Sequence, residues 1–340
     1  MANYTYTGDI SARTGVHAAK DLLKRALADM LTTRIAMNKI LPKKKSRTIS
    51  FRKYEPLNVQ IAALAEYVSD PGEKMTYTDV QAVLEYYSKT IWISDVIQDT
   101  HEDPVLQEAV KLLSEWMSEL TEKINISVLD GGTNVTYAGA ATTQATVASA
   151  ANTGDLRSIS RALRRNRAKP VKEMVRASAD YATDPLEAAF IAMGHVDLGS
   201  DIRDLPDFID VAHYSDPDKA LPGEIGKWED FRFCLSDLFT RNSAAATSVS
   251  TTAFISGGAA PSSASSPDVY SMIVVGQDAF GAVNLQGKKS VQPFVKNPGE
   301  PTKDDTGGRK GFVSITIPYT ALIMQQDFIQ RYEVCATANP

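Results

Sequence analysis

Few side chains in this 340-residue sequence have the types and spacing that covalent or metal chemistry requires. The four histidines include no pair at the spacing of metal ligands; they are His17, His101, His195 and His213. His195 follows a predicted strand, in the segment 194–197 (GHVD), where ligands and catalysts often lie. A single histidine in such a place is more often a turn or interface residue. We therefore predict no metal site, no cofactor and no catalytic residue.

The two cysteines, Cys234 and Cys335, do not indicate a disulfide framework. Cys234 lies within an apolar run (FRFCLSDL), as a small buried hydrophobic residue would. A nucleophile site that combines Cys234, His213 and Asp210 has no support from the neighbouring sequence. One disulfide between the two cysteines is left open. So low a cysteine content is typical of a protein that folds in a reducing cytoplasm.

The glycine-rich segment 306–311 (TGGRKG) invites comparison with a phosphate-binding loop. It has neither the GxxxxGK[ST] nor the GxGxxG spacing, so we interpret it as an exposed loop. Carboxylates are numerous but scattered over predicted helix faces and turns, and no acid–base pair stands out. The sequence therefore predicts that the protein is not an enzyme. A cytosolic hydrolase that uses residues 194–197 is kept as a remote alternative.

Charge is distributed unevenly along the chain, although the net charge of −5 argues against a dedicated nucleic-acid-binding protein. The first fifty residues contain ten Lys or Arg and three Asp, a net charge of +7, so the remaining residues carry −12. This predicts a basic N-terminal arm that docks on an acidic surface, its own or a neighbour's. A solvated amphipathic helix is the alternative. With no long apolar run and no signal-like N-terminus, we expect no membrane contact.

The elements that would position these groups begin with a helix and a long hairpin. Apolar residues at helical spacing predict a helix over 16–40, ending before Pro42. Alternation with period two predicts a strand over 46–54, and a second extended segment covers 76–97. About twenty residues with two turn signals connect them. Two strands joined by so long a link indicate a projecting arm and not a tight hairpin.

The segment 104–126 is the clearest helix. Asp103 is a good N-cap, and Pro104 suits the first helical position. Apolar residues recur every three or four positions as far as Ile124, and glutamates mark the opposite face. About 24 residues span roughly 36 Å at 1.5 Å per residue, which suits an organising spine.

The remainder contains both helices and strands, and the fold class that we predict for the whole chain is α+β. The predicted elements cover 158–174 (helix), 188–193 (strand), 196–205 (short helix), 229–235, 269–275 and 312–320 (strands, the last interrupted by Pro318), and 321–334 (a final apolar element). Two stretches of small polar residues, 132–154 and 243–267, are predicted to be surface excursions that bury little.

The predicted basic helix and its flanks carry the strongest local charge, in Arg157, Arg161, Arg164, Arg165, Arg167 and Lys169. These cations could contact a nucleic-acid backbone, because phosphate contacts need only positive charge and reach. Interleaved aromatic residues for base stacking are lacking. Ion pairs with a neighbouring subunit, or a solvated face, are left open as alternatives.

The order of a basic arm, a long hairpin, a spine helix and an α/β remainder resembles the Hong Kong 97-like capsid fold. Several segments are similar, in this order, to the N-four-type family of tailed-bacteriophage major capsid proteins. They are 2–14 (ANYTYTGDISART), 41–44 (LPKK), 48–52 (TISFR), 102–106 (EDPVL), 161–169 (RALRRNRAK), 187–198 (EAAFIAMGHVDL), 201–203 (DIR), 224–226 (EIG) and 274–281 (VVGQDAFG). The resemblance covers nearly the whole chain.

This resemblance implies a division of the chain. Its parts are an N-terminal arm (1–45), an extended E-loop hairpin arm with its strands (46–98), a peripheral domain (99–180) with the spine helix (104–126), an axial domain (181–320) with a surface insertion (243–267), and a C-terminal element (321–340) that returns to the peripheral domain.

The resemblance also implies a function. The chain would be a major capsid protein that self-assembles, in the host bacterial cytoplasm, into the icosahedral head shell around the double-stranded DNA genome, and would be found in the virion. Its partners would be identical subunits in hexamers and pentamers, the packaged DNA by non-specific contact, and scaffolding, portal and decoration proteins. An encapsulin-like bacterial nanocompartment shell protein is the alternative with the same fold.

The function is therefore expected in the arms and not in a pocket. The residues expected to contact neighbouring subunits lie in the two arms and are Arg13, Lys24, Arg25, Lys43, Lys44, Arg47, Phe51, Arg52, Tyr54, Tyr67 and Tyr77. An arm that becomes ordered on a neighbour adds contact area that a compact domain does not have. We expect residues 46–98 to pack on an adjacent subunit, and residues 1–40 to dock on acidic neighbours near the inner surface.

Overall fold

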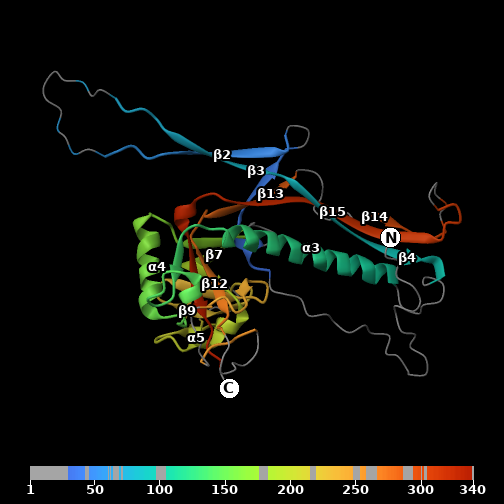
Figure 1. The fold of residues 1–340 in the computed structure, drawn as a ribbon. Coiled ribbons are helices and arrows are strands. Elements are labelled where there is room, and N and C mark those ends of the chain that lie inside the picture. Colours follow the sequence, from blue (N-terminus) through green and yellow to red (C-terminus); the bar gives the residue numbers. More distant parts are fainter. Residues whose placement is uncertain are drawn as a thin grey trace.

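A computed structural model of the chain describes residues 30–42, 46–59, 61, 63, 69, 72–96, 105–175, 183–214, 220–247, 253–257, 266–285, 294–299, 301 and 305–338. Two sheets, a long helix and a two-stranded arm organise these residues (Figure 1).

A five-stranded sheet is built around the long strand β15 (Lys310–Ile323). The other strands are β1 (Met37–Leu41), β4 (Glu85–Ser94), β13 (Phe280–Leu285) and β14 (Phe294–Lys296). One edge of β15 pairs with β4, from Lys310↔Ser94 to Tyr319↔Glu85, and the other edge pairs with β14 and then β13. The short helix α1 (Thr32–Ile35) precedes β1.

Helix α3 (Val105–Asp130) lies along the β15–β4 ladder (Figure 1). Its apolar stripe is buried and includes Ala109, Leu113, Met117, Ile126 and Leu129. The predicted spine helix is thereby confirmed, and it continues four residues beyond the predicted end at 126.

The arm is the two-stranded sheet of β2 (Thr48–Tyr54) and β3 (Tyr77–Val83), which projects away from the body (Figure 1). Both predicted strands exist, but the second extended segment divides at Leu84 into β3 and β4. The backbone N–H of Leu84 donates to the carbonyl oxygen of Arg47, and its own carbonyl accepts from Arg47 Nε at 2.6 Å. A small core of Leu41, Ala82, Leu84, Val283 and Leu322 holds the arm to the body at this point.

A nine-stranded sheet forms the second half of the body. Its strands are β5 (Val135–Tyr137), β16 (Ile329–Cys335), β12 (Val269–Val275), β7 (Thr183–Gly194), β10 (Phe231–Leu235), β9 (Glu224–Trp228) and β8 (Ile209–Asp210) in spatial order, with β11 (Arg241–Asn242) beside β12 and β6 (Val171–Val175) beside β7. Helices α4 (Thr153–Arg165) and α5 (Gly199–Arg203) belong to this half.

The nine-stranded sheet separates two hydrophobic cores. Along β12, Ile273 and Val275 belong to the core that includes α3, whereas Met272 and Val274 belong to the core that includes α4. Both faces of β12 are therefore buried, which explains why its sequence is a continuous apolar run and not an alternating one.

Two predicted helices are too long. Residues 37–40 of the predicted helix 16–40 form β1, because they pair in parallel with β13 from Met37↔Gly281 onward. The predicted helix 158–174 ends at Arg165, since Arg167 adopts a left-handed φ of 59° and Pro170 disfavours helical backbone before it. The segment from Val171 is instead the strand β6.

Two further expectations are wrong in detail. Residues 132–154 are not a simple excursion, because Ala138 and Val147 are buried and β5 pairs with β16. Pro318 does not interrupt its strand, since on β15 it pairs with Tyr86. The C-terminal strand β16 pairs with β12 and with β5, and β5 lies within residues 99–180. The larger division into domains stays a prediction.

Candidate functional surfaces

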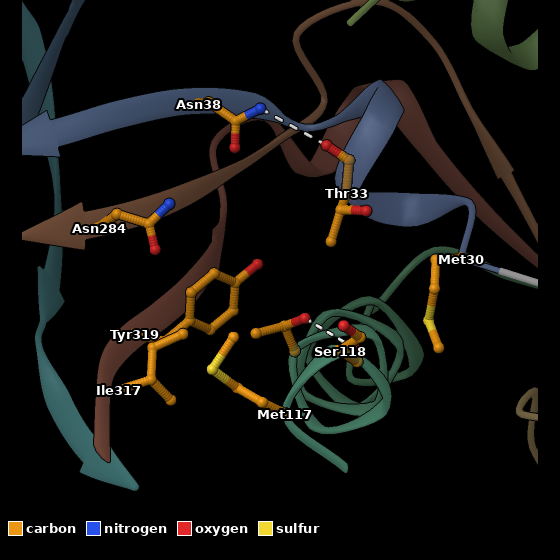
Figure 2. A pocket seen from close by; sticks show the side chains of 9 residues that line it. Met30, Thr33, Asn38, Met117, Ser118, Asn284, Ile317 and Tyr319 are labelled. Carbon is orange, nitrogen blue, oxygen red and sulfur yellow. Dashed lines mark hydrogen bonds between the residues drawn. The ribbon is translucent and has the colours of Figure 1, made fainter. Parts of the chain in front are cut away.

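The described residues do not assemble a reactive pocket. The hollow in Figure 2 has a volume of about 250 Å³ and is lined by Met30, Thr33, Asn38, Met117, Ser118, Thr121, Asn284, Ile317 and Tyr319. Tyr319 is its one titratable side chain, and burial raises the pKa of its hydroxyl to about 12. That hydroxyl donates to Asn125 Oδ1 at 2.7 Å, so it is a structural donor and not an acid–base group.

A buried carboxylate beside this hollow anchors the start of the described chain to the spine helix. Glu122 of α3 is completely buried and accepts hydrogen bonds from the backbone N–H groups of Leu31 and Thr32, at 2.8 and 2.6 Å. The Thr32 hydroxyl donates to the other Glu122 oxygen at 2.8 Å and accepts from Asn125 Nδ2 at 2.9 Å. The point where residues 1–29 join the body is therefore fixed by a polar network in a water-poor site.

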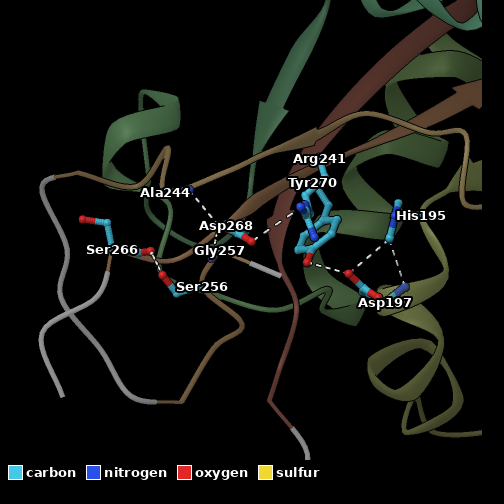
Figure 3. A network of polar contacts seen from close by, with 9 residues as sticks. All are labelled: His195, Asp197, Arg241, Ala244, Ser256, Gly257, Ser266, Asp268 and Tyr270. Atoms are coloured by element: carbon cyan, nitrogen blue, oxygen red, sulfur yellow. Dashed lines mark hydrogen bonds and ion pairs between the residues drawn. The ribbon is translucent and has the colours of Figure 1, made fainter. Parts of the chain in front are cut away.

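His195, the histidine singled out in the sequence, has a structural environment (Figure 3). Its Nδ1 accepts a hydrogen bond from the Asp197 backbone N–H at 3.2 Å. The Asp197 carboxylate in turn accepts from the Tyr270 hydroxyl at 2.7 Å. Burial lowers the pKa of the imidazole, with an opposing contribution from Asp197. The group closes the turn after β7, and nothing in it resembles a nucleophile and its base.

This environment predicts a loss of stability in mild acid. Because the folded-state pKa of His195 lies below the ordinary 6.5, the unfolded chain binds the proton first as the pH falls. Neutral His195 makes its full contribution to the free energy of unfolding at pH values above the pKa that it has in the unfolded chain. This contribution is lost as the pH falls toward the lower pKa that His195 has in the folded protein. Urea unfolding at about pH 7.5 and 5.5 should show a smaller pH-dependent loss for His195→Gln than for the wild type. An equal loss in both proteins would contradict this assignment.

A second buried carboxylate closes the base of the predicted surface insertion (Figure 3). Asp268 accepts from the backbone N–H groups of Ala244 and Gly257, at 2.6 and 2.9 Å. Both residues have positive φ values, 50° and 63°, so the turn geometry and the carboxylate together hold the start of the insertion and a turn inside it next to β12.

The other residues considered as candidates for chemistry also have structural roles. Cys234 and Cys335 are free and buried, and burial raises the pKa of the Cys335 thiol to about 12. Asp210 caps the turn at Ala212, and no hydrogen bond joins it to Cys234 or His213 among the described residues. In the glycine-rich loop, the carboxylate of Asp305 accepts from the Lys310 N–H, which leaves an acid where a phosphate would have to sit. Groups of His, Cys, Asp or Glu that could hold a metal ion do not occur in the described part of the chain.

The arm residues predicted as contacts are largely engaged within the arm itself. Arg52 forms a two-pronged ion pair with Asp79, at 2.8 and 2.9 Å, and its guanidinium lies 4.1 Å from the ring centre of Tyr77. Tyr54 meets Tyr77 edge-on, and Phe51 packs at the root of the arm. These contacts stiffen the arm. The remaining candidates, Arg13, Lys24, Arg25, Lys43, Lys44 and Tyr67, lie outside the described residues.

Beyond Tyr54 the arm exposes apolar side chains that sequence reasoning missed. Leu57, Val59, Ile61 and Met75 are 58%, 88%, 103% and 64% exposed. The sequence does contain a pattern that indicates them: Leu57, Val59 and Ile61 alternate with polar or small residues. This pattern lies inside the link that is predicted to contain turns. An apolar row on a projecting arm indicates a surface that another molecule covers.

Helix α4 presents the predicted basic surface, and two of its cations are paired. Arg157 contacts Glu229 and Arg164 contacts Asp230, each at 2.5 Å. Ser160 donates to the same Asp230 at 2.7 Å. Arg161, Arg165, Arg167 and Lys169 are exposed, and no carboxylate within the described residues forms an ion pair with them.

Comparison with known proteins gives a likeness in structure and none in sequence. The chain matches neither a protein-family model nor a curated protein. It superimposes on the capsid of Ralstonia phage GP4 with a TM-score of 0.68 and 14% identity, over 100% of both chains. The head structure of Helicobacter pylori bacteriophage KHP40 gives a TM-score of 0.65 and 11% identity, over 99% of this chain and 98% of that one. The chain has the Hong Kong 97-like capsid fold.

The Hong Kong 97-like fold confirms the predicted fold class. The chain also has the two features predicted with that fold class, a projecting two-stranded arm (β2–β3) and a long helix (α3). An encapsulin complex from Synechococcus elongatus shares the fold, with a TM-score of 0.54 and 10% identity, over 98% of this chain and 93% of that one. Among the described residues, no helix is long and apolar enough to cross a membrane.

Proposed function

We propose that this chain is the major capsid protein of a tailed bacteriophage. In this proposal identical subunits, arranged in hexamers and pentamers, form the icosahedral head shell that encloses double-stranded DNA, and the protein resides in the virion. The observation that carries the proposal is the stiff arm with its exposed apolar row, in a chain of the capsid fold. Such a row is costly in a monomer and favourable when a second copy covers it.

The arm is proposed to pack on an adjacent subunit and the basic N-terminal arm on acidic neighbours. Scaffolding, portal and decoration proteins are proposed as partners by analogy with other shells of this fold. Many modest contacts for each subunit would hold the shell together through multivalency, although each contact alone is weak.

Particle formation is the direct test. Purified protein, examined by size-exclusion chromatography with light scattering and by negative-stain microscopy at rising concentration, should form closed shells above about a megadalton, as a multivalent subunit does. A monomer or small oligomer at every concentration would contradict the proposal and would favour the alternative that the protein is a hydrolase.

An encapsulin-like nanocompartment is the second candidate, favoured by the likeness to the Synechococcus elongatus encapsulin complex. It would also form shells, so particle size does not separate the two. The contents do: particles from cells should enclose nucleic acid under the capsid proposal and a protein cargo under the alternative. Absorbance ratios and gel analysis of the contents decide between them.

A further inference from the structure

The outer face of α4 and the loop after it form a strongly basic surface. Residues 157–172 contain five Arg, two Lys and no acid. The opposite face of α4 is buried through Leu156, Ile159 and Leu163. The cations therefore share one side of the helix, away from the core.

Two hollows lie on this surface, and the larger of them is shallow and open. One hollow, of about 530 Å³, is lined by Arg157, Ser160, Arg161, Arg164, Arg165 and Asp230. A second, of about 230 Å³, is lined by Arg164, Arg167, Ala168, Pro170, Ala188, Ala189, Phe190 and Asp230. Arg164 and Asp230 line both hollows, so the two adjoin on the helix and its following loop, and we refer to them together as the groove.

Backbone contacts hold the loop in place. The N–H of Ala168 donates to the carbonyl of Leu163, and the N–H of Gln277 donates to the carbonyl of Lys169. The left-handed φ of Arg167 turns the chain at the helix end, and its side chain lines the second hollow. The ion pairs to Glu229 and Asp230 fix Arg157 and Arg164, while Arg161, Arg165 and Arg167 have no described carboxylate partner.

We infer that this groove binds the phosphodiester backbone of double-stranded DNA, through Arg161, Arg165 and Arg167. The inference rests on the proposed function, which places the subunit around DNA. Duplex DNA presents one negative charge per roughly 1.7 Å of axis, so several cations on one helix face find partners at once. Guanidinium groups match phosphate oxygens in two-pronged geometry.

An acidic patch on a second copy fits this surface less well. It would have to supply a carboxylate for each cation, and any cation left unpaired in a protein interface costs free energy. DNA contacts leave the cations partly solvated and release counterions. The groove offers no exposed aromatic side chain for base stacking, since Phe190 is buried. Binding should therefore be independent of base sequence.

The test compares the unassembled wild type with the triple variant Arg161→Gln, Arg165→Gln, Arg167→Gln. Fluorescence anisotropy of a labelled DNA duplex, titrated at several NaCl concentrations, gives the dependence of log K on log salt. Each lost phosphate contact should lower the slope by about 0.9, so the triple variant should lose between two and three. A control variant, Lys111→Gln, Lys123→Gln, Arg203→Gln, removes the same charge from exposed sites elsewhere and should keep the wild-type slope.

Two results would overturn the inference: a wild-type subunit that does not bind DNA, or a triple variant with an unchanged slope. If the slope is unchanged but the triple variant fails to form particles, the groove is a contact between subunits. Particle formation by the wild type is scored separately by negative-stain microscopy. Failure of the proposed function is therefore distinguishable from failure of DNA binding.

Discussion

Replacing residues 58–74 with two glycines is expected to give a folded subunit that no longer forms shells. The deletion removes the part of the arm beyond the β2–β3 ladder, whose last backbone contact joins the Glu55 N–H to the Thr76 carbonyl at 3.0 Å. The root of the arm, with Leu84 and its small core, stays intact. The body should therefore unfold at the wild-type urea midpoint, while particle yield falls by at least about tenfold, because each lost contact is multiplied over the shell.

A milder variant separates apolar contact from arm length. Leu57→Ser, Val59→Ser, Ile61→Ser keeps the arm but removes the exposed apolar row, and it should also fail to assemble. The control Asn58→Ser changes a polar residue of the same segment that is not in the apolar row, and it should assemble as the wild type does. Normal shells from the deletion variant would contradict the role proposed for the arm.

Glu122→Ala should lower the free energy of unfolding by about 3–5 kcal/mol, since two buried backbone N–H groups and a hydroxyl lose their acceptor and each such group costs about 1–3 kcal/mol. Urea denaturation followed by circular dichroism measures this change. The same helix provides the control: Glu119 is an exposed partner of Lys123, and Glu119→Ala should cost only about 0.3–0.5 kcal/mol. Equal losses of stability for the two substitutions would show that the buried Glu122 hydrogen bonds contribute no more than the exposed Glu119–Lys123 ion pair.

Glu122→Ala should also impair assembly, because Glu122 holds the chain at Leu31 and Thr32, where residues 1–29 join the body. Tyr319→Phe offers a graded comparison. It removes only the hydroxyl that donates to Asn125, so it should cost about 1 kcal/mol and leave the two N–H contacts in place.

Local sequence patterns predicted the helices and strands in which each face of the element is either wholly buried or wholly exposed. Helix α3 has an apolar stripe on one face, and β12 is buried on both faces, so each sequence pattern corresponds directly to one element. The fold itself was predicted from family resemblance, with the order of arm, hairpin and spine as independent support. The projecting arm followed from two strand patterns separated by a link too long for a tight turn.

Long-range pairing could not be predicted in this way. Residues 37–40 suit a helix, yet they pair with residues 281–284 as β1, a contact that no local pattern encodes. Pro318 suggests an interruption of the strand, because proline has no backbone N–H to donate. Between residues 314 and 319, however, one edge of β15 has no partner strand among the described residues, so a backbone donor is not needed on that edge. The division of α4's cations into paired and unpaired ones depends on Glu229 and Asp230, more than sixty residues away.

The single-residue junction at Leu84 makes the arm and the body one mechanical element. A neighbour that pulls on the arm pulls β4 along its own axis, against the antiparallel β15. The load then acts in shear on ten residue pairs together and does not peel them apart one after another. The Leu84–Arg47 contacts keep β2 and β3 from opening at the same point. If the proposed shell forms, tension between subunits would thus act on the longest strand pairing among the described residues.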